Sequence, residues 1–476
     1  MKDKKSVLII GAGEAGGMLT REIVKHPELG YFPVGFIDDD PSKKGLRLWG
    51  LPVLGGRNDF PKIVKEKKIN MVFIAIPSAS GEVVRFYVNL AKKAQVPFKI
   101  VPGVYELIDG NVKVEMIREV QLDDLLRRAP VKVNLEEIAS YIYRRRVLVT
   151  GAGGSIGSEL SRQVLQYGSS VLYLLGHGEN SIYHIDLELR ELFPHMDIRP
   201  IIADVQDRKK IEYLFKAEKP QVVFHVAAHK HVHFMESFPE EAVKNNVGGT
   251  LNLIQASLKS GTDRFINIST DKAVNPISAY GASKRIGEIL CTSWAKKWGL
   301  PYSTVRFGNV LGTHGSVVPL FQRQIKRGGP VTITHPMMSR YFMTMGEAVQ
   351  LIIQAGAIGE DGEIFILDMG EPLNIKDLAE ELIRLSGLEP HKDIKIENCG
   401  VRPGEKLEEE LHEENECLVE TGRERILKIA NPLYIPWNAL KPQVDQLLKA
   451  ALEVDRERIF NILKGMVPTM ANQRPG

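Results

Sequence analysis

The feature that most constrains the fold of this chain is a pair of glycine-rich turns, each placed directly after a short apolar run. In the first, SVLIIGAGEAGGML, the residues Gly11, Gly13 and Gly16 have GxGxxG spacing. In the second, VLVTGAGGSIGSEL, the glycines have the tighter TGxxGxxG spacing, beginning at Gly151. Glycines at these positions allow a tight turn from strand to helix, and the helix N-terminus then offers amide donors to a phosphate. The sequence therefore predicts two nucleotide-type α/β units in one chain.

The first unit shows a fold pattern without a set of catalytic residues. After the first turn, the strand-like run VGFIDDD ends in Asp38, Asp39 and Asp40, about where a ribose-binding carboxylate belongs, and a further run, MVFIAIP, ends at Pro77. No catalytic group follows Pro77. Because a fold alone does not establish function, we expect a doubly wound domain with a non-catalytic role. If it binds a nucleotide, the predicted residues are Gly11, Gly13, Gly16 and Asp38.

The second unit carries further signs of a parallel sheet. The apolar runs VLYLLG, PIIADVQD, QVVFHVAAH and FINIST alternate with amphipathic stretches, a pattern typical of a parallel sheet covered by helices. Asp204 and Val205 are placed to meet an adenine, and Ala227 and Ala228 are small enough for a cofactor to lie against the backbone. The sequence predicts a dinucleotide site that includes the glycine turn residues Gly151, Gly154, Ser155, Ile156 and Gly157.

The stretch STDKAVNPISAYGASKR follows the last of these runs and gathers many groups able to move protons. Side chains just past a parallel strand lie where the active sites of such sheets are found. Tyr280 and Lys284 are four residues apart in a predicted helix and therefore share one face. A neighbouring ammonium favours the phenolate, so Lys284 is expected to lower the pKa of Tyr280 and make it a base. The alternative is a polar loop before an ordinary exposed helix turn; behind a TGxxGxxG turn, the functional interpretation is favoured.

On these residues the chain resembles the extended short-chain dehydrogenase/reductases. More narrowly, it resembles the polysaccharide-biosynthesis-type UDP-N-acetylglucosamine 4,6-dehydratases, which serve capsule, O-antigen and glycan synthesis. The motifs that carry the resemblance lie between residues 147 and 411 and are TGAGGSIGSEL, AAHKHVHFMESFPEEAVKNNVGGT, STDKAVNPISAYGASK, VRFGNVLGTHGSVVPLF, THPMMSRYFMT and GVRPGEK. The first unit is similar to the extra domain of the large members. Those members carry membrane helices before that domain, so this chain is expected to be a soluble variant or a shortened form of an anchored protein.

The resemblance implies a mechanism. Hydride passes from C4 of the sugar to NAD while Tyr280, supported by Lys284, takes the O4 proton. Water then leaves across C5 and C6, with Asp271 as the acid and Lys272 as the base at C5, and hydride returns to C6. Thr270 is expected to hydrogen-bond near O4. Burial would favour a protonated Asp271 and a neutral Lys272, whereas their mutual attraction opposes both.

The resemblance also implies how substrate and cofactor are held. Asn309, Arg340, Arg402 and Glu405 are expected at UDP, because a guanidinium offers paired donors to a diphosphate and Glu405 can accept from ribose hydroxyls. Lys230 is expected to reach the cofactor or the sugar. The complete predicted cofactor set is Gly151, Gly154, Ser155, Ile156, Gly157, His177, Asn180, Asp204, Val205, Ala227, Ala228, Lys230, Tyr280 and Lys284.

Two departures from the family pattern leave alternatives open. Many large members have methionine at the position of Tyr280 and are linked to retention at C5, whereas small members with tyrosine are linked to inversion, so the C5 outcome stays open. The family commonly has aspartate at the position of Gly176, where it binds a ribose hydroxyl. Without that carboxylate NAD is favoured only modestly over NADP, since His177 and Asn180 suit either.

Composition narrows the class of protein further. The 476 residues are 43% hydrophobic and 25% charged with a formal net charge of +3, values of an ordinary globular protein that does not bind nucleic acid. Three cysteines without ligand spacing predict reduced thiols, a cytoplasmic location, at most at the inner face of the membrane, and no metal site. The histidines His229, His231 and His233 do not change that expectation. No apolar run in the sequence approaches the roughly 20 residues of a membrane helix. A homo-oligomer is expected from the resemblance.

The predicted organisation is therefore α/β throughout. We expect a Rossmann-like domain over 1–122, a connector over 123–146, the dehydrogenase domain over 147–330, a partly interleaved substrate lobe with C-terminal helices over 331–467, and a tail over 468–476. The leading function is UDP-N-acetylglucosamine 4,6-dehydration. A nucleotide-sugar 4-epimerase, which needs no Asp271–Lys272 pair, and a non-catalytic nucleotide-sensing scaffold are the alternatives.

Overall fold

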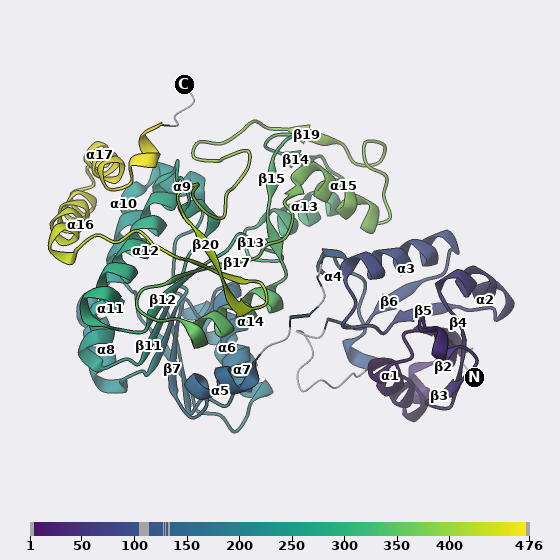
Figure 1. Ribbon diagram of the computed structural model, residues 1–476. Helices are drawn as coiled ribbons and strands as arrows, with labels where there is room; N and C mark the ends of the chain where they lie inside the picture. Colours follow the sequence, from purple (N-terminus) through teal and green to yellow (C-terminus); the bar gives the residue numbers. More distant parts are fainter. Residues whose placement is uncertain (1–3, 104–113, 127, 129, 132–133, 473–476) are drawn as a thin grey trace. The chain divides into compact units, whose positions relative to one another are not determined.

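The computed structural model describes residues 4–472 except 104–113, 127, 129, 132 and 133, and the chain divides into two compact units (Figure 1). The first unit comprises residues 1–130 with 385–387, and the second comprises 131–384 with 388–476. Within the expected connector, helix α4 (Leu122–Leu126) belongs to the first unit and α5 (Leu135–Ile142) to the second. Parts of the predicted connector (127, 129, 132 and 133) and tail (473–476) lie outside the described residues.

The first unit is a six-stranded sheet in the order β3-β4-β2-β1-β5-β6, parallel except for the β3–β4 pair. Its strands are β1 (Lys5–Ile10), β2 (Tyr31–Ile37), β3 (Arg47–Leu48), β4 (Leu51–Gly55), β5 (Met71–Ile74) and β6 (Phe98–Ile100). Besides α4, its helices are α1 (Glu14–Lys25), α2 (Phe60–Glu66) and α3 (Gly81–Lys93). The doubly wound arrangement predicted for this unit is confirmed.

The second unit is built on a nine-stranded sheet in the order β20-β21-β17-β12-β11-β10-β7-β8-β9. Its strands are β7 (Arg146–Thr150), β8 (Val171–Gly176), β9 (Ile198–Ile202), β10 (Val222–His225), β11 (Arg264–Ile268), β12 (Tyr302–Arg306), β17 (Ile364–Leu367), β20 (Leu418–Arg423) and β21 (Ile426–Ile429). From β9 to β12 the strands follow the order 3-2-1-4-5-6 of a Rossmann fold. The hairpin β20–β21 joins the far edge antiparallel, so the C-terminal part of the chain shares the main sheet.

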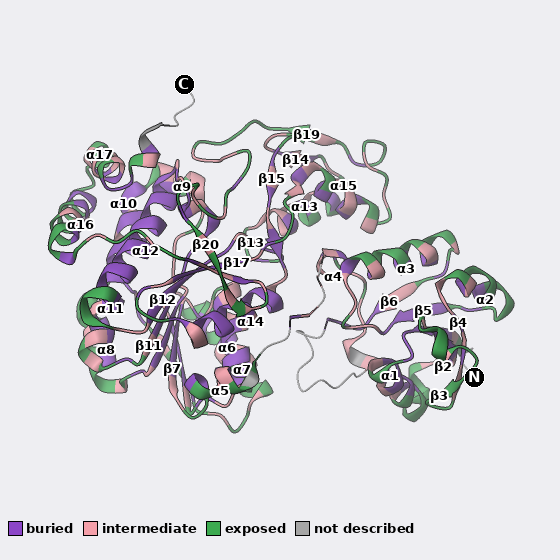
Figure 2. Cartoon of the chain, in the orientation of Figure 1, coloured by how far each residue is buried: buried purple, intermediate pink, exposed green. Residues whose placement is uncertain are grey.

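Helices cover both faces of this sheet, as neighbouring residues of β7 illustrate. Val147 and Val149 pack into a cluster with α5, α6 (Ser155–Gln166), α7 (Glu179–Leu192) and α14 (Met345–Ile358). Leu148 points the other way, into a cluster with α8 (Arg208–Glu218), α11 (Gly249–Ser260), α12 (Ala279–Trp298), α16 (Trp437–Leu452) and α17 (Arg456–Met466). Helix α12 is buried from its start through Ala295, which makes it the central helix of that face (Figure 2).

The remaining elements form the substrate lobe and its connections. They are α9 (Val232–Ser237), α10 (Pro239–Ala242), a π-helical turn (Val243–Gly248), β13 (Asn309–Val310), α13 (Val317–Lys326), β14 (Val331–Ile333), β15 (Ser339–Arg340), β16 (Phe342–Met343), β18 (Leu373–Asn374), α15 (Ile375–Leu385) and β19 (Ile396–Asn398). Three two-stranded pairs, β13–β16, β14–β19 and β15–β18, hold the lobe together. A short 3-10 helix (Pro468–Asn472) ends the described chain, with Met470 buried.

A buried ion cluster ties three distant segments of the second unit together. Arg306 at the end of β12 is fully buried and donates to both carboxylate oxygens of Glu288 on α12, at 3.0 and 2.8 Å. It also donates to Glu416 at 2.7 Å, and Arg285 donates to Glu288 and Glu416 at 2.9 and 3.0 Å. Burial alone would raise the pKa of Glu288, but the two guanidiniums lower it to about 2. The ion cluster therefore holds charged carboxylates in the core.

Replacing Arg306 by leucine is predicted to destabilise the second unit strongly. Arg306→Leu leaves two buried carboxylates short of a partner, and breaking such a pair costs about 3–5 kcal/mol. Urea unfolding followed by fluorescence of Trp294 and Trp437 measures the loss. Arg199→Leu is the matched control, because Arg199 also contacts two carboxylates but at the exposed surface, and it should unfold like the parent protein. An unchanged midpoint for Arg306→Leu would contradict the prediction.

Candidate active site

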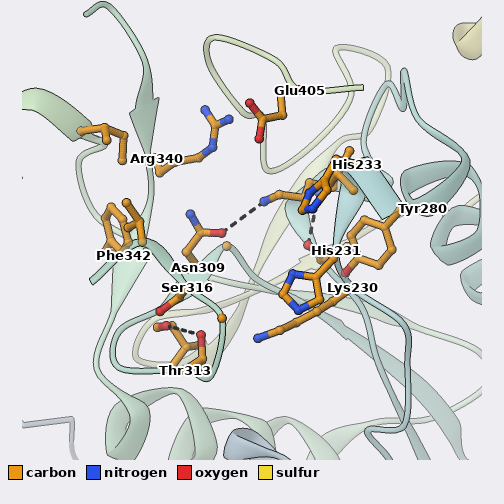
Figure 3. A pocket seen from close by; sticks show the side chains of 18 of the residues that line it. Lys230, His231, His233, Tyr280, Asn309, Thr313, Ser316, Arg340, Phe342 and Glu405 are labelled. Atoms are coloured by element: carbon orange, nitrogen blue, oxygen red, sulfur yellow. Dashed lines mark hydrogen bonds between the residues drawn. The ribbon is translucent and has the colours of Figure 1, made fainter. Parts of the chain in front are cut away.

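Two cavities meet beside the carboxyl ends of the strands of the second unit. The first, of about 390 Å³, is lined by most of the predicted catalytic and substrate residues (Figure 3). The second, of about 490 Å³, is lined by the glycine turn of this unit. Both are bordered by the same six residues, namely Ile156, Val226, Ala228, Lys230, His231 and Thr313. The two cavities are therefore adjoining parts of one site.

The glycine turn between β7 and α6 needs its glycines. Gly151 has a φ of +66°, and a Cβ at Gly157 would lie 2.2 Å from the carbonyl oxygen of Gly151. The N-cap of α6 is Gly154, so no side chain caps the helix and its first amides face the second cavity. The predicted cofactor residues that line this cavity are Gly151, Gly154, Ser155, Ile156, Gly157, His177, Val205, Ala227, Ala228 and Lys230.

Of the other predicted cofactor residues, Tyr280 and Lys284 line the first cavity, whereas Asn180 and Asp204 line neither. Asn180 is exposed on α7 and does not line either cavity. The Asp204 carboxylate accepts a hydrogen bond from the amide of Gln206 at 2.8 Å and stabilises the turn after β9. Its neighbour Val205 lines the second cavity.

Thr270, Asp271 and Lys272 come together just past β11. Asp271 is fully buried, and its Oδ1 accepts hydrogen bonds from Thr270 Oγ1 at 2.9 Å and Lys272 Nζ at 3.0 Å. Lys272 Nζ also donates to Asn309 Oδ1 at 3.2 Å, which links the pair to the predicted substrate residues. Asp271 Oδ2 is buried without a hydrogen-bond partner among the described residues, and Asp271 itself lines neither cavity.

The charge of Lys272 follows from its two acidic neighbours. Burial lowers the pKa of Lys272, but the carboxylates of Asp271 and Glu409 more than offset that effect and the net shift is upward. Glu409 Oε1 lies 3.7 Å from Lys272 Nζ. Of the two opposing effects expected from the sequence, attraction to the carboxylate therefore prevails over burial at this lysine.

The expected influence of Lys284 on Tyr280 is wrong. Burial raises the pKa of Tyr280 to about 12, and the cation that opposes this rise is Lys272. Lys284 Nζ instead donates to the carbonyl oxygen of Ile268 at 2.6 Å, and burial lowers the pKa of Lys284 to about 8. Spacing on the helix correctly placed both side chains in the first cavity, but it could not report how deeply they are buried.

The predicted substrate residues Asn309, Arg340, Arg402 and Glu405 all line the first cavity (Figure 3). Arg340 already donates to the carbonyl oxygens of Leu407 and Lys406, at 3.0 and 2.8 Å. Arg402 is exposed, and its amide donates to the Glu405 carboxylate at 3.4 Å. Arg340 thus fixes the backbone that follows the RPGEK motif as well as bordering the cavity.

Several lining residues were not predicted from the sequence. Thr313 and Ser316 follow Asn309 in the loop GTHGS. In the same loop, His314 Nδ1 and Ser155 Oγ form a hydrogen bond of 3.0 Å. A glycine-flanked polar loop directly after Asn309 is a signal that could have indicated this contact. The acidic neighbour of Lys272, Glu409, gives no such signal in the sequence, because it lies in the acidic run EEELHEENE, which is typical of a solvated surface.

The glycine turn of the first unit differs from that of the second in one contact. Gly11 has a φ of +100°, and a Cβ at Gly16 would lie 2.0 Å from the Gly11 carbonyl oxygen. Gly13 is the N-cap of α1. Asp38 Oδ2 accepts from the amide of Ala12 at 2.8 Å and from Lys43 Nζ at 3.0 Å. The predicted carboxylate is in place and holds the turn itself.

Two further features concern metals and membranes. In the part of the chain that the structure describes, no three His, Cys, Asp or Glu side chains gather as ligands of a metal ion. None of the helices within the described ranges combines the length and the apolar character that crossing a membrane requires.

Each unit is similar to a known protein family. Residues 147–431 match the family model described as polysaccharide biosynthesis protein, and residues 1–102 match the model described as CoA-binding domain. The chain is 48% identical over 414 residues to the probable polysaccharide biosynthesis protein EpsC of Bacillus subtilis, covering 87% of this chain and 69% of that protein. It is 41% identical over 464 residues to the capsular polysaccharide biosynthesis protein CapD of Staphylococcus aureus, covering 97% and 76%.

More distant relatives carry more specific names. The chain is 31% identical over 271 residues to an inverting UDP-N-acetylglucosamine 4,6-dehydratase of Campylobacter jejuni, covering 56% of this chain and 77% of that protein. It is 33% identical over 279 residues to a UDP-glucose 4-epimerase of Rickettsia akari, with the same coverage of 56% and 77%.

Solved structures agree on the fold. The X-ray structure of Pen from Bacillus thuringiensis superimposes with a TM-score of 0.57 at 35% identity, covering 62% of this chain and 90% of that one. A dTDP-glucose 4,6-dehydratase from Streptomyces venezuelae superimposes with a TM-score of 0.51 at 22% identity, covering 56% and 88%. From its sequence relatives, its match over residues 147–431 and its fold, this chain belongs to the polysaccharide biosynthesis protein family, a group of nucleotide-sugar dehydratases and epimerases.

Proposed function

We propose that this protein is a nicotinamide-dependent 4,6-dehydratase that converts UDP-N-acetylglucosamine to a UDP-4-keto-6-deoxy-hexosamine for surface polysaccharide or glycan synthesis. The observation that carries the proposal is the buried Asp271–Lys272 pair, whose lysine lines the same cavity as Tyr280 and whose aspartate lies directly behind it. Oxidation at one carbon needs only a base and a hydride acceptor. An acid and a second base beside them are what removal of water needs in addition.

The second cavity suits a dinucleotide. The uncapped N-terminus of α6 offers amide donors and a partial positive charge to a diphosphate, and the turn glycines leave room for its approach. Ala227, Ala228 and Val205 would face the flat rings, while Lys230, Tyr280 and Lys284 border the end of the site nearest the sugar. A bound NAD or NADP supplies a hydride acceptor for C4 of the sugar and a hydride donor for C6. NAD is our proposal, with NADP as the alternative.

Tyr280 is proposed to take the proton of the O4 hydroxyl, with Thr270 hydrogen-bonded near the same oxygen. The tyrosine is buried and holds its proton tightly until a positive charge stands near its oxygen. The Lys272 ammonium of the resting ion pair opposes the rise of the Tyr280 pKa and so favours loss of that proton, and Lys284 holds the strand end through Ile268. Loss of the O4 proton leaves a keto group at C4, which acidifies the hydrogen at C5.

Asp271 and Lys272 are proposed to remove water together. The Lys272 amine takes the C5 proton as the C6–O bond breaks, and Asp271 gives its proton to the departing hydroxyl, which leaves as water. The two groups therefore end as an ion pair, the arrangement held by the 3.0 Å hydrogen bond. As hydride returns to C6, the Lys272 ammonium gives a proton back to C5, and the proton that Tyr280 took from O4 replaces the one that Asp271 gave to the departing water.

A nucleotide-sugar 4-epimerase is the second candidate, favoured by the similarity to the Rickettsia akari protein. Epimerisation needs oxidation and reduction at C4 alone. Nothing in that chemistry requires a buried carboxyl group next to Lys272, which is why dehydration is our first proposal. Cytoplasmic location and a homo-oligomer stay predictions from the resemblance.

Incubation of the protein with UDP-N-acetylglucosamine in deuterium oxide tests the proposal. We expect a product lighter by one water in mass, before the deuterium it gains is counted, with deuterium at C5 because Lys272 exchanges its protons with solvent. NMR of the product also reports the C5 configuration. A product of unchanged mass with inverted C4 would support the epimerase, and protein that retains its dinucleotide yet leaves every UDP-hexosamine unchanged would refute both.

Replacing Asp271 by asparagine is predicted to separate the two halves of the reaction. Asp271→Asn keeps the shape of the side chain but cannot deliver a proton, so water loss should fall about 10²–10⁴-fold. Oxidation at C4 should persist, visible as near-ultraviolet absorbance of a reduced nicotinamide that accumulates after substrate is added. Asp377→Asn, at an exposed aspartate of α15, is the control and should behave like the parent protein. Equal loss of both half-reactions would count against the assigned role of Asp271.

A further inference from the structure

The segment that begins within the RPGEK motif passes beside Lys272 and is held at both ends. We call residues 405–416 the acidic segment. Near its start, the carbonyl oxygens of Lys406 and Leu407 accept from Arg340. Near its end, the Leu411 carbonyl oxygen accepts from Arg306 at 3.1 Å, and Glu416 belongs to the buried ion cluster. Its middle therefore has little freedom to move away from the site.

Glu409 lies at that middle and is buried, with 7% of its surface exposed. Its Oε1 lies 3.7 Å from Lys272 Nζ and 3.8 Å from Arg340 Nε. Its Oε2 is buried and makes no hydrogen bond to the residues that the structure describes. Lys272 is thus flanked by two carboxyl groups, Asp271 and Glu409, and the proposed reaction uses only the first.

From this geometry we infer that Glu409 is a positioning residue whose negative charge keeps the proton shared by Asp271 and Lys272 on that pair. The inference rests on the proposed function, because only an elimination that uses this pair depends on its proton. Glu409 does not line the first cavity, and its charged contacts are with Lys272 and Arg340, so it acts through these cations rather than on the sugar.

The physical reason is the count of protons that elimination requires. Asp271 with its proton and Lys272 as an amine together carry one proton, as many as the resting ion pair. One proton more blocks the base, and one fewer removes the acid. A fixed negative charge about 4 Å away makes the pair hold protons more strongly, so both limits of the active pH range move to higher pH.

The other charged groups around Lys272 do not cancel this effect. The titratable groups whose charges act on Lys272 or respond to it are Asp271, Tyr280, Lys230, Arg340 and Glu409. Burial raises the pKa of Glu409, and the carboxylate of Asp271 adds to that rise; the ammonium of Lys272 and the guanidinium of Arg340 oppose it, and the net shift is upward. Arg340 lowers the pKa of Lys272, but Asp271 and Glu409 outweigh it. The net effect at the lysine is that of the carboxylates.

Glu409→Gln is predicted to shift the pH profile of water loss to lower pH. Glutamine has almost the same shape without the charge, so both limbs of the bell-shaped kcat profile should move by about one pH unit in the acid direction. The KM for the UDP-sugar should change little. Glu409→Ala removes the charge together with most of the side chain, and we expect the same shift for it. This variant replaces Glu409→Gln in the test if the glutamine variant does not fold.

Two further variants separate charge from shape. Glu409→Asp keeps the charge but shortens the side chain. Its pH profile should therefore lie closer to that of the parent protein than the profile of the isosteric Glu409→Gln does. A merely structural role predicts the opposite ranking. Glu408→Gln changes the exposed neighbouring glutamate and should leave the profile unchanged.

Labelling of Lys272 tests the same inference without substrate. Only the amine form reacts with acetic anhydride, so the labelling rate at a pH below the pKa of Lys272 should rise up to about tenfold in Glu409→Gln. Peptide mass spectrometry reads the rate at Lys272, with the exposed Lys392 as internal reference. Unchanged labelling and an unchanged profile would overturn the inference even if dehydration is confirmed. A labelling shift in a protein that dehydrates no UDP-sugar would leave the electrostatic effect standing and refute the proposed function instead.

Discussion

The buried ion cluster of Arg306, Arg285, Glu288 and Glu416 is the constraint on which the geometry of the site depends. Glu288 also accepts from the hydroxyl of Ser269 at 2.6 Å, so the same carboxylate that is neutralised by the arginines fixes the start of the Thr270–Lys272 turn. Charges without access to water must stay paired, because separating them costs far more than an exposed ion pair does. The acidic segment therefore cannot leave the sheet without exposing or orphaning Glu416. The cluster links the rigidity of the core to the position of the proposed acid and base.

Helix α12 carries this constraint into the site through its periodicity. Tyr280, Lys284 and Glu288 are spaced by four residues and lie along one side of the helix, from the cavity to the ion cluster. The helix is buried on nearly every side, which excludes water from the side chains of this row. Burial accounts for the direction of each change: the pKa of Tyr280 rises and that of Lys284 falls, because both shifts favour the uncharged form. A proton acceptor placed here is strong once it is ionised, but it needs a nearby positive charge to reach that state.

The sequence alone located the elements that depend on local pattern. The glycine turns and most strand runs follow from short local motifs, and the four-residue spacing of Tyr280 and Lys284 places both side chains in the first cavity; the third run is shifted, because its strand β9 spans Ile198–Ile202 rather than the whole of PIIADVQD. The sequence could not reveal pairings between distant segments. Glu416 meets Arg306 across 110 residues and Glu409 meets Lys272 across an even longer separation, yet both lie in an acidic run that is typical of solvated surface. The predicted direction of the Tyr280 pKa shift was wrong for the same reason, because depth of burial is set by tertiary packing. The hairpin β20–β21 likewise joins the main sheet by long-range pairing that no local pattern announces.

The two glycine turns show how one fingerprint serves different surroundings. In the second unit, Gly176 ends β8 at a position where members of the family commonly have aspartate. The first residues of α6 line a cavity, and no side chain caps the helix. In the first unit, Asp38 stands at the end of β2 and accepts from the Ala12 amide of the turn itself, while Lys43 neutralises it. The Ala12 amide, which already donates to this carboxylate, is not available to a phosphate. The same spacing of glycines therefore leaves the turn beside an open cavity in the second unit, whereas in the first unit one amide of the turn is already paired with a carboxylate of the protein.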